Sequence, residues 1–289
     1  MSLRGGRSFM ELARDSDAPM TMFAGTELYN ADVPPVTARG VSIADTDLDD
    51  ALRGPVLDIL WDKSGTDDLR GVLAGLVATG FSEARVKRVL DNHPAPENWR
   101  VGEALAEAFL VEHRDCEFPW PSGRDLKNPA ASPAGTDLVG FQRTTTETDL
   151  YRFAFGEVKT SGEGRWPPGV MNGRHGMEKQ LEDLRDRADM KDSLVKYLGH
   201  HALRASWLSC YKSATKRYLA SPSDVSLFGI LVRDVEAKPE DLSKRAADLA
   251  AGCPAGTSIE LRGMYLPLNS ISTLAERAMR TRESTNGQN

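Results

Sequence analysis

The sequence predicts an α/β protein with a mixed central sheet that contains an antiparallel hairpin and is flanked by helices, plus a helical N-terminal subdomain. Two segments, Gly135–Phe141 and Asp149–Ser161, read as strands joined by the polar run 144–148, which predicts the hairpin. Val225–Val232 is a continuous apolar run, typical of a strand buried on both faces. Segments with helical periodicity surround these strands, so the order of elements favours helices packed against a sheet.

Length and composition set the broad class of protein. At 289 residues and 40% hydrophobic content, the chain is long enough to bury a sizeable core. Its three cysteines have neither metal-ligand nor disulfide-framework spacing, which favours reduced thiols and a cytoplasmic location. No segment has the apolar character of a signal peptide or a membrane span, so we expect neither secretion nor membrane insertion.

The first 96 residues are expected to form a mainly helical region with partner binding as a candidate role. Residues 1–45 read as an irregular or short-stranded lead-in. Helical periodicity then covers 47–61, 66–78 and 82–92, and Ser82 is the expected N-cap of the last helix. Pro and Asn residues between 92 and 98 mark the expected boundary.

A second region, residues 97–280, contains the sheet. Its expected elements, in order, are a helix over 98–112 capped by Asn98, a strand at 116–120, the hairpin, helices over 177–188 and 192–220, the strand 225–232, a helix over 239–251, a strand over 258–268 and a helix over 271–279. The polar tail 281–289 is expected to be disordered.

The hairpin gathers acidic and basic side chains. Aromatic residues and then Glu157 and Lys159 occupy alternate positions of its second segment, so a strand places them on one face. If the run 144–148 forms the turn, Asp137 lies opposite Gly156, one residue from Glu157. Asp137, Glu157 and Lys159 then meet at one end of the hairpin.

Such a group suits phosphodiester hydrolysis. Mg²⁺ prefers hard oxygen ligands, which the carboxylates of Asp137 and Glu157 and the carbonyl of Val158 offer. Lys159 would position the attacking water, help to deprotonate it and offset developing negative charge. The alternative is a surface ion pair between Glu157 and Lys159.

The chain contains its own control for this pattern. Glu236-Ala-Lys238 also follows a strand, and Asp224 precedes that strand. An unbroken apolar strand separates Asp224 from Glu236, which places them about 40 Å apart. The second copy therefore reads as a solvated connection, and a metal site requires the turn that returns Asp137 to Glu157.

The residues around the first copy resemble the PD-(D/E)xK nuclease superfamily, with Gly135-Thr136 in place of the proline that often precedes the first acid. The motifs also resemble the HamA C-terminal-domain family of Hachiman anti-phage defence. They are Gly102-Glu-Ala-Leu-Ala-Glu107, Gly135-Thr-Asp-Leu-Val-Gly140 and Gly156-Glu-Val-Lys159, and the resemblance covers roughly residues 97–268.

The resemblance implies a restriction-endonuclease-like fold and a Mg²⁺- or Mn²⁺-dependent nuclease. In it Asp137 and Glu157 hold the metal, Lys159 is catalytic and Glu103 is an additional ligand. A polar residue on the helix after the lysine assists in related nucleases, and Gln180 has that place here.

The Hachiman family implies a DNA substrate and a helicase partner. The net charge of −6 argues against a chain that is coated in nucleic acid, although residues 171–220 carry ten basic and six acidic side chains. The alternative function is a non-catalytic nucleic-acid-binding or regulatory module with a nuclease-like fold.

Overall fold

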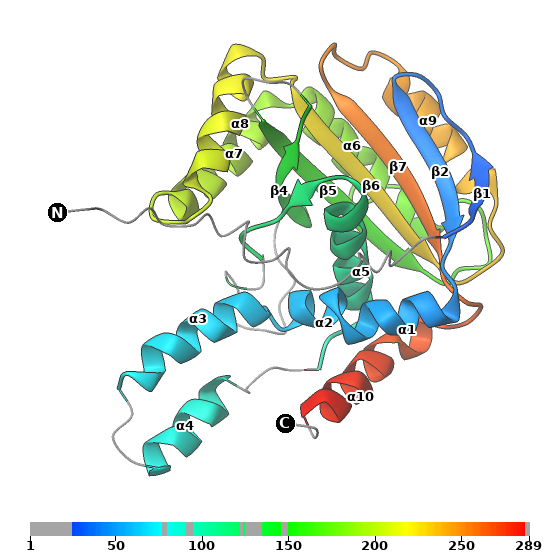
Figure 1. Ribbon diagram of the computed structural model, residues 1–289. Coiled ribbons are helices and arrows are strands. Elements are labelled where there is room, and N and C mark those ends of the chain that lie inside the picture. Colours follow the sequence, from blue (N-terminus) through cyan, green and yellow to red (C-terminus); the bar gives the residue numbers. More distant parts are fainter. Residues whose placement is uncertain are drawn as a thin grey trace.

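The computed structural model describes residues 25–76, 80–90, 95–121, 124, 135–145 and 150–286. In these residues the strands are β1 (Glu27–Asn30), β2 (Val36–Ser42), β3 (Cys116–Glu117), β4 (Leu138–Arg143), β5 (Tyr151–Ser161), β6 (Val225–Arg233) and β7 (Ser258–Tyr265). They form one mixed sheet in the order β1-β2-β7-β6-β5-β4-β3 (Figure 1). Strands β2, β7, β6 and β5, which are neighbours in this order, are mutually parallel. Strands β1, β3 and β4 each pair antiparallel with a neighbour.

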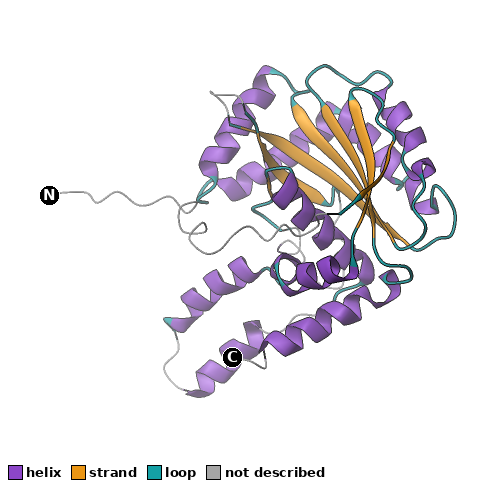
Figure 2. Cartoon of the chain, turned by 45° about the vertical axis from the view of Figure 1, so that its right-hand side comes forward, coloured by secondary structure: helices purple, strands orange, loops and turns teal. Residues whose placement is uncertain are grey.

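Helices flank both faces of this sheet, so the predicted α/β class with a mixed sheet and an antiparallel hairpin is confirmed (Figure 2). In the described ranges the α-helices are α1 (Asp45–Arg53), α2 (Pro55–Leu60), α3 (Lys63–Ala74), α4 (Gly80–Leu90), α5 (Asn98–His113), α6 (Met177–Asp186), α7 (Ala188–Ala202), α8 (Leu208–Ala220), α9 (Ser243–Ala250) and α10 (Leu274–Asn286). None of them has the length and apolar character needed to cross a bilayer.

Two hydrophobic cores hold the layers together, one on each face of the sheet. Residues of α1, α2, α5 and α10 pack on one face, against Ala154 and Val158 of β5 among others. Residues of α6, α7, α8 and α9 pack on the other face, against Phe153 and Phe155. The alternation along β5 therefore puts Glu157 and Lys159 on the same face as α6. All nine residues of β6 are buried, as its apolar run predicts.

The hairpin forms, but its register differs by one residue from the expected one. Leu138, rather than Asp137, lies opposite Gly156, and Asp137 comes level with Glu157 just before β4 begins. The residues assumed to centre the turn lie within 146–149, outside the described residues. The register is set by packing, because Leu138 and Phe141 of β4 enter opposite cores.

Other sequence-based boundaries also change. The expected helix 192–220 is two helices, α7 and α8, because the chain reverses at residues 203–207, where Trp207 packs on Phe141 with ring centroids 5.8 Å apart. No glycine or proline marks this turn in the sequence. Helix α10 continues to Asn286, through most of the expected disordered tail, and α4 begins at Gly80, so Ser82 is not its N-cap.

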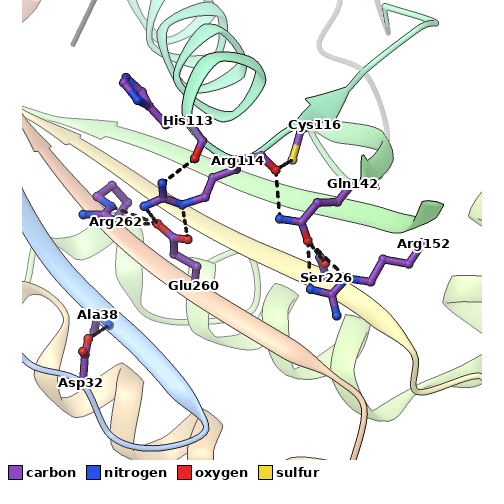
Figure 3. A network of polar contacts seen from close by, with 10 residues as sticks. All are labelled: Asp32, Ala38, His113, Arg114, Cys116, Gln142, Arg152, Ser226, Glu260 and Arg262. Atoms are coloured by element: carbon purple, nitrogen blue, oxygen red, sulfur yellow. Dashed lines mark hydrogen bonds and ion pairs between the residues drawn. The ribbon is translucent and has the colours of Figure 1, made fainter. Parts of the chain in front are cut away.

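Helix α5 is anchored at both ends. The Asn98 side chain does not cap it, because its Oδ1 accepts a hydrogen bond from the Ala275 N–H of α10 at 2.9 Å. At the other end, Nε and Nη2 of Arg114 donate to Glu260 of β7 at 2.6 and 2.8 Å, and Arg262 pairs with the same carboxylate (Figure 3). These contacts fix the helix that carries Glu103.

Replacement of Phe153 by alanine should destabilise the fold strongly. Its fully buried ring contacts Phe141, Phe155 and Tyr218 with centroids about 6 Å apart, so Phe153→Ala opens a cavity and should lower the free energy of unfolding by about 3–5 kcal/mol. Urea unfolding followed by circular dichroism measures the change. Leu219→Ala, at a 76% exposed position, is the control and should shift stability by at most about 0.5 kcal/mol.

Candidate active site

The candidate site lies where β5 extends beyond its neighbour β4. β4 pairs with β5 only as far as Gly156, whereas β5 continues to Ser161 alongside β6. On its β4 side, no strand among the described residues pairs with the last part of β5. Polar side chains occupy this edge instead.

Asp137 takes the place of the missing strand. Its Oδ2 accepts a hydrogen bond from the Val158 N–H at 2.8 Å. The N–H and C=O groups of one strand residue point to the same side, so the Val158 carbonyl is also directed toward Asp137. A carboxylate and a carbonyl oxygen are thereby brought to one edge of the sheet.

Glu157 and Lys159 are hydrogen-bonded beside this edge, and they form an ion pair when Glu157 is ionised. Lys159 Nζ donates to Glu157 Oε1 at 2.6 Å, and the side chains are 20% and 1% exposed. Such a buried carboxylate is stable as an ion only while it is paired. The pair therefore lies inside the site and is not the surface pair that was the alternative interpretation.

The carboxyl groups of Asp137 and Glu157 lie close enough to share a proton. Burial, reinforced by the neighbouring charge of Asp137, raises the pKa of Glu157 to about 8. Burial also raises the pKa of Asp137, although the Val158 hydrogen bond and the charge of Lys159 oppose the rise. Oε2 of Glu157 is buried and receives no hydrogen bond from a described residue.

Glu103 approaches from α5, on the other face of the sheet. Gly102 allows the approach, because a Cβ atom there would collide with Oγ1 of Thr160 on β5. Burial and then the charge of Asp137 raise the pKa of Glu103 to about 7. The Glu103 carboxylate is paired with Arg100, whose Nη1 donates to Oε2 at 2.6 Å.

Gln180 lies on the same face as Glu157, on α6, but makes no hydrogen bond to the site. The turn that contains Gln180 packs over Gly229, the β6 partner of Glu157, where a Cβ atom would lie 2.7 Å from Leu181 and 3.0 Å from Met177. The Oε1 atom of Gln180 is buried without a hydrogen-bond partner among the described residues. Gln180 is thus linked to the site by the helix turn on which it lies.

The donor set fits a hard divalent cation. Asp137, Glu157 and the Val158 carbonyl offer the oxygen ligands that Mg²⁺ or Mn²⁺ prefers, and Glu157 Oε2 is a buried oxygen to which no described residue donates. Glu103, as the fourth candidate, is turned to Arg100. In the described part of the chain, no three side chains of metal-ligating type already form a ligand cluster.

Sequence reasoning missed Arg100 and assigned no role to Glu107. Arg100 lies three residues before Glu103 on one helix face, and this spacing alone would have found it. Burial raises the pKa of Glu107, one turn beyond Glu103, to about 7.

The second Glu-x-Lys copy has a structural role. Glu236 pairs with Lys238 at 3.4 Å, and Lys238 Nζ lies 3.8 Å from the ring centroid of Trp166. Trp166 also donates to the Glu236 carbonyl at 2.8 Å, so its indole packs against this segment.

Comparison with known proteins gives no further assignment: no family model matches the chain, and no curated protein matches it either.

In the cation-free protein, thermal stability should fall as pH rises from about 4.5 to 8. The native state retains a proton on Glu157, whose pKa is about 8, and the unfolded chain releases it near the ordinary value of 4.5. The unfolded state binds fewer protons in this window, so the free energy of unfolding decreases with pH. Melting temperatures measured in EDTA across this range test the sign.

The decrease of melting temperature with pH should be smaller in Glu157→Gln, whose side chain cannot titrate. It should be unchanged in Glu276→Gln, at an exposed position of α10. A melting temperature that rises with pH through this window would contradict the assignment.

Proposed function

We propose that the chain is a Mg²⁺- or Mn²⁺-dependent DNA nuclease subunit of a prokaryotic anti-phage defence system, which hydrolyses phosphodiester bonds together with a helicase partner. The nuclease chemistry rests on the geometry of the site. The defence system and the helicase follow from the resemblance of the motifs around Glu103, Asp137 and Glu157 to the HamA family.

One observation carries the nuclease proposal: Asp137 and Glu157 lie side by side at the open edge of β5, with Lys159 paired to Glu157. Asp137 Oδ2 is fixed by Val158, and Lys159 Nζ is 2.6 Å from Glu157. A solvated strand end would not bury Glu157 to 1% exposure beside another acid.

Each residue has a defined task in this proposal. Asp137, Glu157 and the Val158 carbonyl would hold the cation, with Glu103 as an additional ligand. A bound cation supplies Lewis acidity toward the phosphate and lowers the pKa of water. Lys159, which contacts Glu157, would orient water and offset the negative charge that develops on the phosphate.

The charge distribution supports a nucleic-acid substrate. The basic segment 171–220 includes α6, α7 and α8, which pack on the sheet face that carries Glu157 and Lys159. A segment of net positive charge on this face would attract phosphates even though the chain as a whole is acidic. The acidic remainder of the surface is consistent with a partner that contributes further DNA affinity.

Mutation of the site should abolish Mg²⁺-dependent nicking of plasmid DNA. We expect Glu157→Ala and Lys159→Ala each to lower the rate by a hundredfold or more, on the order seen when a charge-stabilising group is removed from an active site. The matched controls are Glu236→Ala, from the second Glu-x-Lys copy, and Lys244→Ala, at an exposed position of α9. Both should retain wild-type activity.

Full activity in both site variants would show that the assignment is wrong. A wild-type protein that is silent with its partner and with Mg²⁺ or Mn²⁺, yet still binds DNA, would instead identify a non-catalytic nucleic-acid-binding or regulatory module.

A further inference from the structure

Arg100 is bound to one of the acids of the candidate site. It lies in the first turn of α5, and its guanidinium is bound to Glu103, one turn later, at 2.6 Å. The two side chains are 19% and 9% exposed, so the ion pair is largely withdrawn from water. A half-buried arginine keeps its charge and requires an anionic acceptor.

The charge of Arg100 acts on three carboxyl groups of the site. Burial raises the pKa values of Glu103, Glu107 and Asp137, and in all three cases the guanidinium of Arg100 opposes the rise. Arg100 therefore acts on these three acids, although it bonds only to Glu103 among the described residues.

Glu103 cannot serve Arg100 and a divalent cation equally. A carboxylate that turns to the cation beside Asp137 gives up at least part of its bond to the guanidinium. Arg100 would then be a half-buried cation without its acceptor. The planar fork of a guanidinium matches the two non-bridging oxygens of a phosphodiester, which is the anion that a nuclease site receives.

We propose that Arg100 is a substrate-binding residue that holds Glu103 in the cation-free state and exchanges this carboxylate for a non-bridging oxygen of a nucleic-acid phosphodiester when a cation is bound. The proposal rests on the nuclease function proposed above. It assigns to Arg100 two opposed effects, competition with the cation for Glu103 and attraction of the substrate.

These opposed effects separate substrate binding from a structural role. Mn²⁺ binding without DNA is measured by isothermal titration calorimetry. Binding of a fluorescent duplex is measured by anisotropy in Ca²⁺, which allows binding to be followed apart from cleavage. Arg100→Ala should strengthen Mn²⁺ binding severalfold, because the competitor for Glu103 is removed. It should weaken duplex binding by about tenfold to a hundredfold, as expected for loss of a charged hydrogen bond.

Two variants complete the design. Arg100→Lys keeps the charge but not the fork, and should recover part of the duplex affinity. Arg277→Ala is the matched control, because Arg277 of α10 is 18% exposed and forms an equally short ion pair, 2.6 Å, with Asp49 of α1 outside the candidate site. It should lower the melting temperature and leave both affinities unchanged.

Loss of both affinities in Arg100→Ala, in proportion to a loss of melting temperature, would overturn the proposal in favour of a structural role. Unchanged affinities would also overturn it. Failure of the nuclease function itself has a different signature. A wild-type protein whose Mn²⁺ binding is absent, or is insensitive to Asp137→Ala and Glu157→Ala, lacks the site on which Arg100 is proposed to act.

Discussion

The hydrogen bond from the Val158 N–H to Asp137 Oδ2 is the interaction on which the site depends. β5 extends beyond β4, and without a partner the backbone of Val158 would be left unpaired at the sheet edge. The Asp137 side chain satisfies the donor and is held beside Glu157. One contact therefore completes the sheet, fixes a carboxylate and directs the Val158 carbonyl to the same place.

Two glycines let helices reach this edge from both faces. Gly102 brings α5 against Thr160, so that Glu103 is near Asp137, and Gly229 allows α6 to pack beside Glu157. Because α5 is anchored at both ends, by Asn98 to α10 and by the Arg114 network to β7, the position of Glu103 is set by the fold. The precision of the site thus comes from packed elements rather than from loops.

Concentrating buried acids at one edge is unfavourable without a cation. Burial raises the pKa of Glu157 to about 8 and that of Glu103 to about 7, which means that desolvation outweighs the opposing charges of Lys159 and Arg100. A fold with hydrophobic side chains in place of these acids would be at least as stable, so the acids do not serve stability. Groups with strongly shifted pKa values gather at functional sites. The proposed cation would balance the charge of these acids, and the proposed phosphate would balance that of Arg100.

Local pattern alone determined much of this protein. Period-two alternation placed Glu157 and Lys159 on one face, the apolar run identified β6 as a buried strand, and the polar run implied the hairpin that returns Asp137. Only the tertiary structure decided the register, since packing of Leu138 and Phe141 into opposite cores moved Asp137 level with Glu157. It also decided that Asn98 bonds α10 rather than capping α5, and that the chain turns at Trp207. The periodicity of a segment depends on residues that are consecutive in the chain. Register and inter-helix contacts depend on side chains far apart in the chain, whose packing no local pattern specifies.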